Sequence, residues 1–338
     1  MATRICSYNV EWFDHLFDKD NNLITFEPQN KKHKELKKQL EGLKKVFETV
    51  KADLYGIVEA PNTSTTTGNQ STVEKLKNFF LHIGLNNYEV ITGFISPGKQ
   101  ELALIYNKDK LEVKYKPGGT NTKKNPPFDG VLEYDTDDDK IKEIYKFYRP
   151  PLEAEITIKQ TNEKFYLILV HAKSKGIFTS VDMVKWEKEN LRNRRKLFAE
   201  CTWIRRRVDE WLDKNRKVVV MGDINDGPGM DFYEARFGRS AVETIMGDIF
   251  EPEKMLKNYV GRPKWGQYGW EPSSTRFTDR FTETPVNALI DHIMLSQDIP
   301  CSSDKIKIWN PYILDEAKPI KFDLIAASDH FPVTADIF

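Results

Sequence analysis

The sequence lacks the features that mark exported or membrane proteins. Its 338 residues include only three cysteines, Cys6, Cys201 and Cys301, which stand far apart. This spacing predicts neither a disulfide framework nor a zinc site built from cysteine and histidine. No apolar run approaches the roughly 20 residues that cross a bilayer, and residues 1–4 contain no apolar stretch of the signal-peptide kind. We therefore expect a cytoplasmic protein with no membrane span.

An excess of charge of either sign is also missing. Lys and Arg total 51, Asp and Glu total 51, and the formal net charge is zero, which argues against a strongly basic nucleic-acid-binding protein. Residues 185–217 are uneven, with twelve Lys or Arg against six Asp or Glu. This stretch is either a surface that follows a nucleic acid backbone or a solvated helix face, and we favour the helix face for most of its residues.

The sequence does contain an apolar run that ends abruptly in polar residues. Residues 218–221 (VVVM) are followed by Gly222, Asp223 and Asn225. A buried strand that ends at a functional site has this pattern. Side chains two residues apart on an extended chain face the same way, so Asp223 and Asn225 can act on one substrate atom.

Five further strand ends show the same pattern. The polar residues concerned are Asn9 and Glu11, Glu59, His171, Asp291, and the pair Asp329 and His330. Each has a structural alternative, such as a turn cap, a solvated loop residue or a hydrogen-bonded core side chain. Six such coincidences favour a site, because functional residues of layered α/β proteins gather at strand ends.

In their order along the chain, these segments resemble the motifs of the endonuclease/exonuclease/phosphatase superfamily, typified by pancreatic deoxyribonuclease. The matching segments are 7–12 (SYNVEW), 56–59 (GIVE), 170–171 (VH), 222–225 (GDIN), 290–293 (IDHI) and 328–333 (SDHFPV). The resemblance implies an α/β (α+β) four-layer sandwich, in which helices flank two stacked mixed β-sheets. It also implies one domain spanning residues 1–338, because the six motifs can form one site only if both halves fold together.

Four segments look similar to bacterial extracellular nucleases of this superfamily. They are 149–152 (RPPL), 171–176 (HAKSKG), 223–229 (DINDGPG) and 277–281 (FTDRF). The chain departs from those exported enzymes because it starts directly at its first strand. It also has Glu59 in a Val-Glu-Ala sequence instead of the commoner Gln-Glu pair.

The resemblance implies a divalent metal, Mg²⁺ or Mn²⁺, bound by oxygen ligands. Hydrolysis of a phosphate ester places negative charge on the phosphoryl group and the leaving oxygen, and a hard cation stabilises both. Glu59 matches the superfamily's metal glutamate. Asn9, Glu11 and Asp329 are the candidate partners around the ion.

By the same resemblance, Asp223 orients or deprotonates the attacking water and Asn225 fixes the attack geometry. His330 contacts the scissile phosphate or acts as the base, with Asp291 holding its imidazole. A carboxylate on one ring nitrogen sets the tautomer and stabilises the imidazolium.

His171 is expected to supply a second imidazole, for the phosphate or for the leaving group. Glu101 is our guess for the carboxylate that holds it, and His292 is expected to be structural. The candidate substrate-binding cations are Arg149, Lys173 and Lys175, each with a solvated surface position as its alternative.

The remaining sequence indicates how the elements are arranged. Apolar spacing predicts amphipathic helices over 34–50 and 183–213 and a shorter one near 232–245. Residues 116–150 are rich in Pro, Gly and Asp and predict a long substrate-side loop or hairpin. The aromatic segment 265–270 either stacks bases or packs in the core, and we favour the core.

We therefore favour a metal-dependent phosphodiesterase that acts on nucleic acid, most simply DNA, with no protein partner implied. One alternative is a small-molecule or lipid-head-group phosphoesterase of the same superfamily, since fold does not settle substrate. Another is a non-catalytic scaffold on this fold. The intact set of candidate site residues argues against the scaffold.

Overall fold

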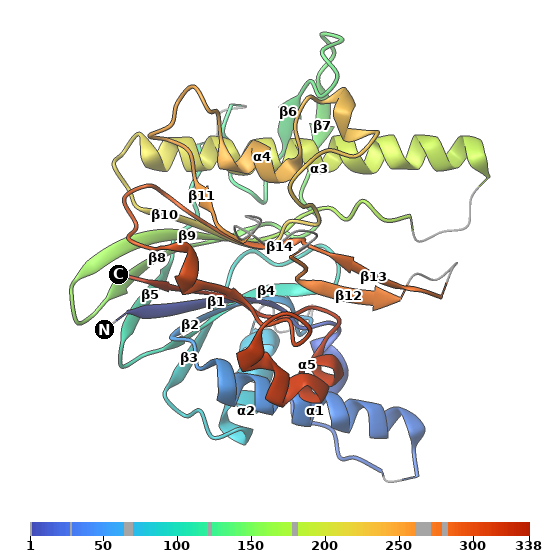
Figure 1. Ribbon diagram of the computed structural model, residues 1–338, viewed down its shortest axis with the longest axis vertical. Coiled ribbons are helices and arrows are strands. Elements are labelled where there is room, and N and C mark those ends of the chain that lie inside the picture. The colour runs from blue at the N-terminus through green and yellow to red at the C-terminus, as the bar shows by residue number, and fades with distance from the viewer. Residues whose placement is uncertain are drawn as a thin grey trace.

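Two six-stranded mixed sheets pack face to face between layers of helices (Figure 1). The computed structural model describes residues 2–27, 29–63, 70–120, 124–177, 182–260, 272–278 and 283–338. In spatial order, the first sheet contains β15 (Ile306–Ile308), β16 (Val333–Ile337), β1 (Thr3–Asn9), β2 (Leu54–Ala60), β4 (Glu101–Asn107) and β3 (Tyr88–Thr92). The second contains β11 (Lys257–Asn258), β14 (Asp291–Leu295), β10 (Val218–Asp223), β9 (Glu163–His171), β8 (Leu152–Ile158) and β5 (Leu111–Tyr115). The expected four-layer sandwich is confirmed.

The two sheets share one internal plan. Each has a parallel pair at its centre, β1 with β2 and β9 with β10. An antiparallel strand flanks each pair, β16 beside β1 and β14 beside β10. Parallel strands end at the same edge of a sheet, so the polar residues at these strand ends are brought to one end of the sandwich. The chain termini lie at the opposite end (Figure 1).

Helices cover both outer faces of the sandwich (Figure 1). The first sheet is covered by α1 (Lys31–Val50), α2 (Gln70–His82) and α5 (Lys321–Ala327), and the second by α3 (Met183–Leu212) and α4 (Ala241–Met246). The short 3₁₀ segments are η1 (Phe13–Leu16), η2 (Glu234–Arg236), η3 (Ser303–Lys305) and η4 (Asp315–Ile320). Two hairpins project from the body, β6 (Leu132–Tyr134) with β7 (Glu143–Tyr145), and β12 (Thr275–Thr278) with β13 (Pro285–Ala288).

The two long predicted helices are confirmed, and the structure shows why they begin where they do. The side chain of Asn30 accepts hydrogen bonds from the backbone N–H groups of Lys32 and His33, so α1 starts at residue 31. Asp182 caps α3 in the same way through the N–H of Lys185. An N-cap of this kind satisfies donors that have no partner within the helix.

The helix predicted near 232–245 is wrong as one element. The chain forms η2 and then α4, separated by Gly238 with φ of 74°. Ser240 opens α4 with a capping box closed by Glu243, which fixes a new helix start. The expected hairpin within 116–150 is β6–β7, and it packs against α3 instead of the site, for example through the ring contact between Tyr134 and Phe198. The aromatic segment 265–270 lies outside the described residues.

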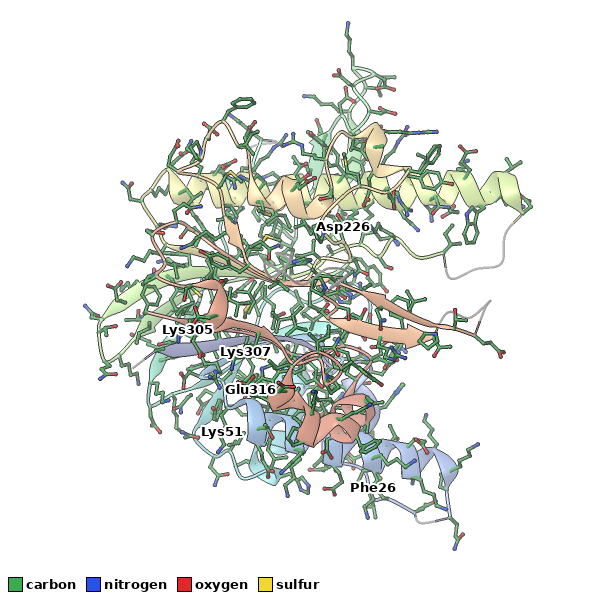
Figure 2. All side chains as sticks on the ribbon, in the orientation of Figure 1. Phe26, Lys51, Asp226, Lys305, Lys307 and Glu316 are labelled. Atoms are coloured by element: carbon green, nitrogen blue, oxygen red, sulfur yellow. The ribbon has the colours of Figure 1, made fainter. Side chains whose placement is uncertain are left out.

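Apolar side chains from both halves of the chain fill the space between the sheets (Figure 2). Ile5 and Leu104 from the first sheet meet Leu169 and Met221 from the second in one buried cluster. Neither sheet therefore has a complete core alone. A shared core is what a single domain requires, and the single domain itself stays a prediction. In the part of the chain that the structure describes, no helix has the length and apolar character needed to cross a bilayer.

Several arginines of the basic stretch 185–217 hold the helix layer to the protein. Arg207 is fully buried and forms an ion pair with Glu153 of β8. Arg205 donates to the carbonyl oxygens of Ile245, at 3.2 Å, and Met246, at 3.0 Å. These guanidinium groups tie elements together, so the structural interpretation of the stretch holds for them.

Candidate active site

The register of the second sheet places three predicted site residues in one row. Asp223, the last residue of β10, lies opposite His171, the last residue of β9, and opposite Asp291, the first residue of β14. Nε2 of His171 is 3.8 Å from Oδ2 of Asp223. All three side chains are buried, so their charges interact in a poorly screened environment.

Asn9 joins this row from the facing sheet. Its amide Nδ2 donates to Oδ2 of Asp223 at 3.1 Å, across 214 residues of sequence. The other oxygen of Asp223 accepts the backbone N–H of Asn225 at 2.8 Å. The side-chain amide of Asn225 donates to the carbonyl of Ala172 at 3.1 Å. These contacts hold the Asp223 carboxylate in one orientation at the meeting point of the two sheets.

Gly222 is required where β10 ends. Its φ is 139°, and a Cβ built there would lie 2.0 Å from the carbonyl oxygen of Val170 on β9. Any side chain would push the strands apart and move Asp223. Asn225 has φ of 55°, a left-handed conformation that asparagine tolerates better than most residues. The Gly-Asp-Ile-Asn sequence therefore serves the backbone as well as the chemistry.

His330 is held by Asp291, as the resemblance implied. Nδ1 of His330 lies 2.8 Å from Oδ2 of Asp291, which also accepts the hydroxyl of Ser274 at 2.7 Å. Burial opposes the charged ring, but Asp291, together with Asp223 and Asp329 nearby, raises the pKa of His330 to about 10. His330 is therefore an imidazolium at neutral pH.

His171 has the opposite protonation state. Burial lowers its pKa well below the ordinary value, and the positive charges of Arg149 and His330 lower it further. Burial and the neighbouring charge of Asp291 raise the pKa of Asp223 to about 7. Together with His330, the row thus combines a neutral imidazole (His171), an imidazolium (His330) and a carboxyl group that titrates near neutrality (Asp223), which is the combination that acid–base chemistry uses.

Glu59 lies beside this row at an irregular point of β2. The pairing with β4 shifts between Val58 and Ala60, and Glu59 has φ of 59°. One carboxylate oxygen accepts the amide of Gln100 at 2.6 Å and the backbone N–H of Trp12 at 3.4 Å. Burial raises the pKa of Glu59. Non-glycine residues held at positive φ are frequent at functional sites.

The oxygen atoms around Glu59 fit a hard divalent cation. Oδ1 of Asn9 and Oδ1 of Asp329 are buried and, among the described residues, have no hydrogen-bond partner. Buried polar atoms are normally paired, and carboxylate and amide oxygens are the ligands that Mg²⁺ prefers. Burial raises the pKa of Asp329 to about 6, although the charge of His330 opposes the rise. The neighbouring charge of Glu11 adds to it, so Glu11 also lies close to this group of oxygen atoms.

A second trio, Asp223, Asp291 and His330, has ligand atoms within 4.8 Å of one another. In this trio Nδ1 of His330 is already engaged by Asp291 at 2.8 Å, so the oxygen atoms of Glu59, Asn9 and Asp329 fit a cation better. Nε2 of the same ring lies 3.8 Å from Oδ1 of Asp329.

Two of the three predicted substrate-binding cations lie next to the row. The guanidinium of Arg149 donates to Gln100, and its Nε is buried without a hydrogen-bond partner in the described structure. Lys173 is half-buried, and its Nζ donates to the carbonyl of Ser174 at 2.8 Å. Arg149, His171 and Lys173 line a recess of about 250 Å³.

The comparisons with known proteins agree with this arrangement at the level of fold. No family model and no curated protein matches the sequence. Among solved structures, ANGEL2, a 2′,3′-cyclic phosphatase, superposes with a TM-score of 0.54 at 12% identity, over 100% of this chain and 95% of that one. A mannosyl-6-phosphatase from Bacteroides thetaiotaomicron gives 0.51 at 14% identity, over 100% of both chains. A further endonuclease/exonuclease/phosphatase family protein from the same organism gives 0.51 at 13%, over 100% and 97%.

The chain has the endonuclease/exonuclease/phosphatase fold. The likeness inferred from six short motifs is thereby confirmed for the architecture. In this fold, the two central parallel pairs carry the candidate site at their ends, and the substrate has to be argued from the site itself.

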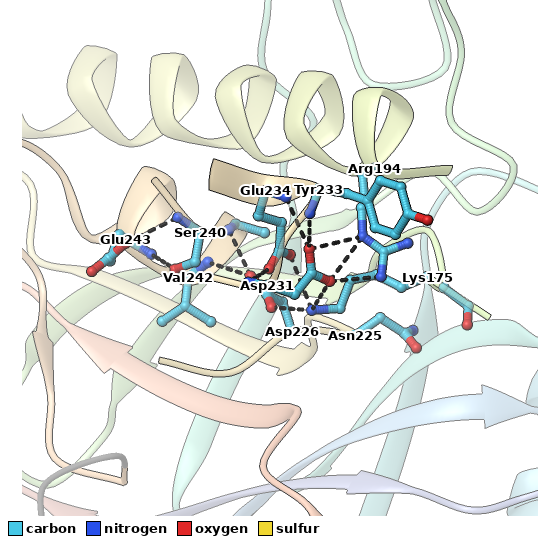
Figure 3. A network of polar contacts seen from close by, with 12 residues as sticks. Lys175, Arg194, Asn225, Asp226, Asp231, Tyr233, Glu234, Ser240, Val242 and Glu243 are labelled. Carbon is cyan, nitrogen blue, oxygen red and sulfur yellow. Dashed lines mark hydrogen bonds and ion pairs between the residues drawn. The ribbon is translucent and has the colours of Figure 1, made fainter. Parts of the chain in front are cut away.

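The structure corrects the prediction for Lys175, because two carboxylates of neighbouring loops neutralise its charge. Its Nζ donates to Oδ1 of Asp226 at 2.6 Å and to Oε1 of Glu234 at 3.0 Å. Figure 3 shows these contacts beside the ion pair between Arg194 and Asp231, beneath α3. Lys175 therefore joins the loop after β9 to the loop after β10 and is not a free phosphate ligand. Glu234 lies 59 residues further along the chain, and the sequence pattern gave no indication of this pairing.

The guess that Glu101 holds His171 is also wrong. The carboxylate of Glu101 accepts the backbone N–H of Ser96 at 3.1 Å, whereas Nδ1 of His171 has no hydrogen-bond partner in the described part of the chain. His292 is structural, as expected. Its ring nitrogens lie 3.0 Å from the Asn258 amide and 2.9 Å from a backbone carbonyl.

Four residues of the site were missed in the sequence. Gln100 bridges Glu59 and Arg149, and Ser274 supports Asp291, while the other two, Lys196 and Glu200, come from α3. Polar residues on a helix or before a strand are common, so nothing local marks these four.

Proposed function

We propose that this protein is a divalent-metal-dependent phosphodiesterase in which water attacks phosphorus. The observation that carries the proposal is the buried row of His171, Asp223 and Asp291, in which Asn9 of the facing sheet donates to Asp223 and Asp291 holds the ring of His330. An imidazolium stabilises the charge that develops on phosphate oxygens. A carboxylate with a pKa of about 7 accepts a proton from water at physiological pH.

In this mechanism Asp223 takes a proton from the attacking water while the water oxygen bonds to phosphorus. The ester bond opposite breaks, and the leaving oxygen takes up a proton from solvent as it departs. Nε2 of His330 donates to a phosphate oxygen, and Asp291 keeps the ring charged and oriented. The neutral ring of His171 donates a second hydrogen bond to the phosphate. Asn9 and Asn225 hold Asp223 in place for this proton transfer.

A divalent cation bound by Glu59, Asn9 and Asp329 would neutralise charge on the phosphate oxygens. We propose Mg²⁺ or Mn²⁺, since all three residues offer hard oxygen ligands. Glu11 is close enough to contribute through a bridging water.

The proposed substrate is DNA. The motifs similar to bacterial nucleases support it, as do Arg149 and Lys173 beside the row, since cations next to a scissile phosphate favour a polyanionic strand. A small phosphate ester is the second candidate. It is favoured by two of the structural relatives, whose names describe a 2′,3′-cyclic phosphatase and a mannosyl-6-phosphatase.

The test is hydrolysis of plasmid DNA alongside bis(p-nitrophenyl) phosphate, with Mg²⁺, with Mn²⁺ and with EDTA. His330→Ala protein, prepared in parallel, controls for contaminating nuclease. Metal-dependent nicking that disappears in this variant supports a nuclease. Cleavage of the small diester with intact plasmid moves the substrate to small molecules, and no cleavage of either overturns the proposal.

A further inference from the structure

The recess beside His171 is lined by more positive charge than one scissile phosphate needs. Its walls are Tyr148, Arg149, Lys173 and Ser174 from two loops, with Lys196 and Glu200 from α3. Three cations therefore face one carboxylate. The recess measures about 250 Å³ and opens next to the row, so it can hold a group attached to the reacting phosphate.

Glu200 is the one carboxylate beside the two lysines, and Arg149 also feels the charges of Glu59 and Asp223. Glu200 accepts the backbone N–H of Lys173 at 2.8 Å and lies 3.8 Å from Nζ of Lys196. Burial raises the pKa of Glu200 to about 7 although these lysines oppose the rise. Burial lowers the pKa of Lys173, and the cations of Lys196, Arg192 and Arg149 add to this effect against the opposing charge of Glu200. Like charges held this close favour the binding of an anion between them.

Unpaired polar atoms belong to residues that line the same recess. Nδ1 of His171 and Nε of Arg149 are both buried and have no hydrogen-bond partner among the described residues. Buried polar atoms without partners are uncommon. A ligand with acceptor oxygens in the recess would satisfy the Nε–H of Arg149, while the one N–H of the neutral His171 ring serves the scissile phosphate.

We propose that this recess binds a second phosphate group of the substrate, next to the scissile phosphate, and that Lys196 of α3 is its specificity-determining contact. The inference rests on the proposed function only in placing the scissile phosphate at the His171–His330 row. The second phosphate can be a terminal monoester of a short strand or the next diester of a longer one, because both present anionic oxygens to the same cations.

Four thymidine compounds distinguish a terminal phosphate monoester from a neighbouring diester as the second phosphate. TpT carries one phosphate, whereas pTpT, TpTp and TpTpT each add a second at the 5′ end, at the 3′ end or within the strand. Their dissociation constants are measured with Mg²⁺ on His330→Ala protein, so that turnover plays no part. At least one of the three should bind about tenfold more tightly than TpT, the effect of one charge-assisted contact.

The tighter binding of the two-phosphate compound should disappear when Lys196→Met is introduced into the His330→Ala protein. It should persist with Lys188→Met, a matched change at an exposed lysine two turns earlier on α3. Glu200→Gln should increase it, because Glu200 is the one carboxylate among the described residues that line the recess. Equal affinity for all four compounds overturns the proposal, as does an advantage that survives Lys196→Met or is lost equally in the Lys188→Met control.

Failure of the proposed function is recognised separately. If the wild-type protein cleaves neither DNA nor bis(p-nitrophenyl) phosphate, the hydrolase proposal falls, while the affinity ranking still decides the role of the recess.

Discussion

At the scale of single residues, neighbouring charges set the chemistry of the two site histidines. His330 is buried against Asp291 and keeps a proton, whereas His171 has no carboxylate on Nδ1 within the described structure and stays neutral. The same residue type thus supplies an imidazolium and a neutral donor a short distance apart. Environment alone distinguishes them, as with paired acid and base groups in other enzymes.

The raised pKa of His330 predicts how stability depends on pH. The folded value is about 10 against an ordinary 6.5, so between these values the folded protein holds a proton that the unfolded chain releases. In metal-free protein, the free energy of unfolding should therefore fall as pH rises from 6.5 to 10, by up to about 1.4 kcal/mol per pH unit from this group. Asp291→Asn should flatten the slope in urea unfolding with EDTA. Identical slopes for the two proteins would show that the pair does not shift the pKa.

Glu59 should control metal dependence more than substrate binding. Glu59→Gln removes the charge of the proposed metal ligand and keeps its shape, so half-maximal activity should need at least about tenfold more Mg²⁺. The measurement is initial rate against Mg²⁺ concentration, with the exposed Glu41→Gln of α1 as the matched control. An unchanged Mg²⁺ curve would remove Glu59 from the ligand set.

At the scale of elements, the sequence predicted the strand ends better than the contacts between them. Apolar runs that stop at a polar residue located β1, β2, β9 and β10, because burial ends where the strand leaves the core. Gly238 and Ser240 mark the break between η2 and α4 in the sequence. The apolar spacing across them nevertheless led to the prediction of one continuous helix. The partner of Lys175 was not predictable, since the pairing depends on how two loops pack beneath α3.

The close approach of β9 and β10 makes Gly222 the most sensitive backbone position of the site. Gly222→Ala adds a clash with the Val170 carbonyl to an unfavourable φ, so it should cost about 3 kcal/mol. Gly229 also has a positive φ, but a Cβ there meets nothing within 4 Å, and Gly229→Ala should cost only about 1 kcal/mol. Urea denaturation of both variants measures the difference, and equal losses would contradict the argument from packing.

Lys175→Met tests the structural role of the network in Figure 3. It leaves the buried Asp226 and Glu234 carboxylates without their cation, and the free energy of unfolding should fall by about 2–3 kcal/mol. The KM for DNA of the folded variant should change less than that of Arg149→Met. A stable Lys175→Met protein with weakened DNA binding would restore the substrate-binding role first predicted for this lysine.

At the scale of the whole molecule, one site is assembled from segments that span nearly the entire chain. Asn9 and Asp223 are hydrogen-bonded across 214 residues, and the carbonyl of Asn9 accepts the hydroxyl of Ser328 across 319. The six motifs implied this convergence through the resemblance. The distances and protonation states could not be predicted, because they depend on packing between two sheets.

A shared core between the sheets predicts cooperative unfolding of residues 1–338. Calorimetry of the full chain should show one transition, with calorimetric and van't Hoff enthalpies equal, provided that heating is reversible. Two separable transitions would indicate that the halves fold independently, contrary to the prediction of a single domain.

The most direct test of the central claim is the rate of bis(p-nitrophenyl) phosphate hydrolysis in saturating Mg²⁺ by wild-type and His330→Ala protein. His82→Ala, at an exposed position in the last turn of α2, is the matched control. Loss of an acid–base or charge-stabilising group should lower the rate by about 10²–10⁴-fold, while His82→Ala keeps the wild-type rate. A His330→Ala protein that is folded and hydrolyses the diester at the wild-type rate would contradict the assignment of this row as the active site.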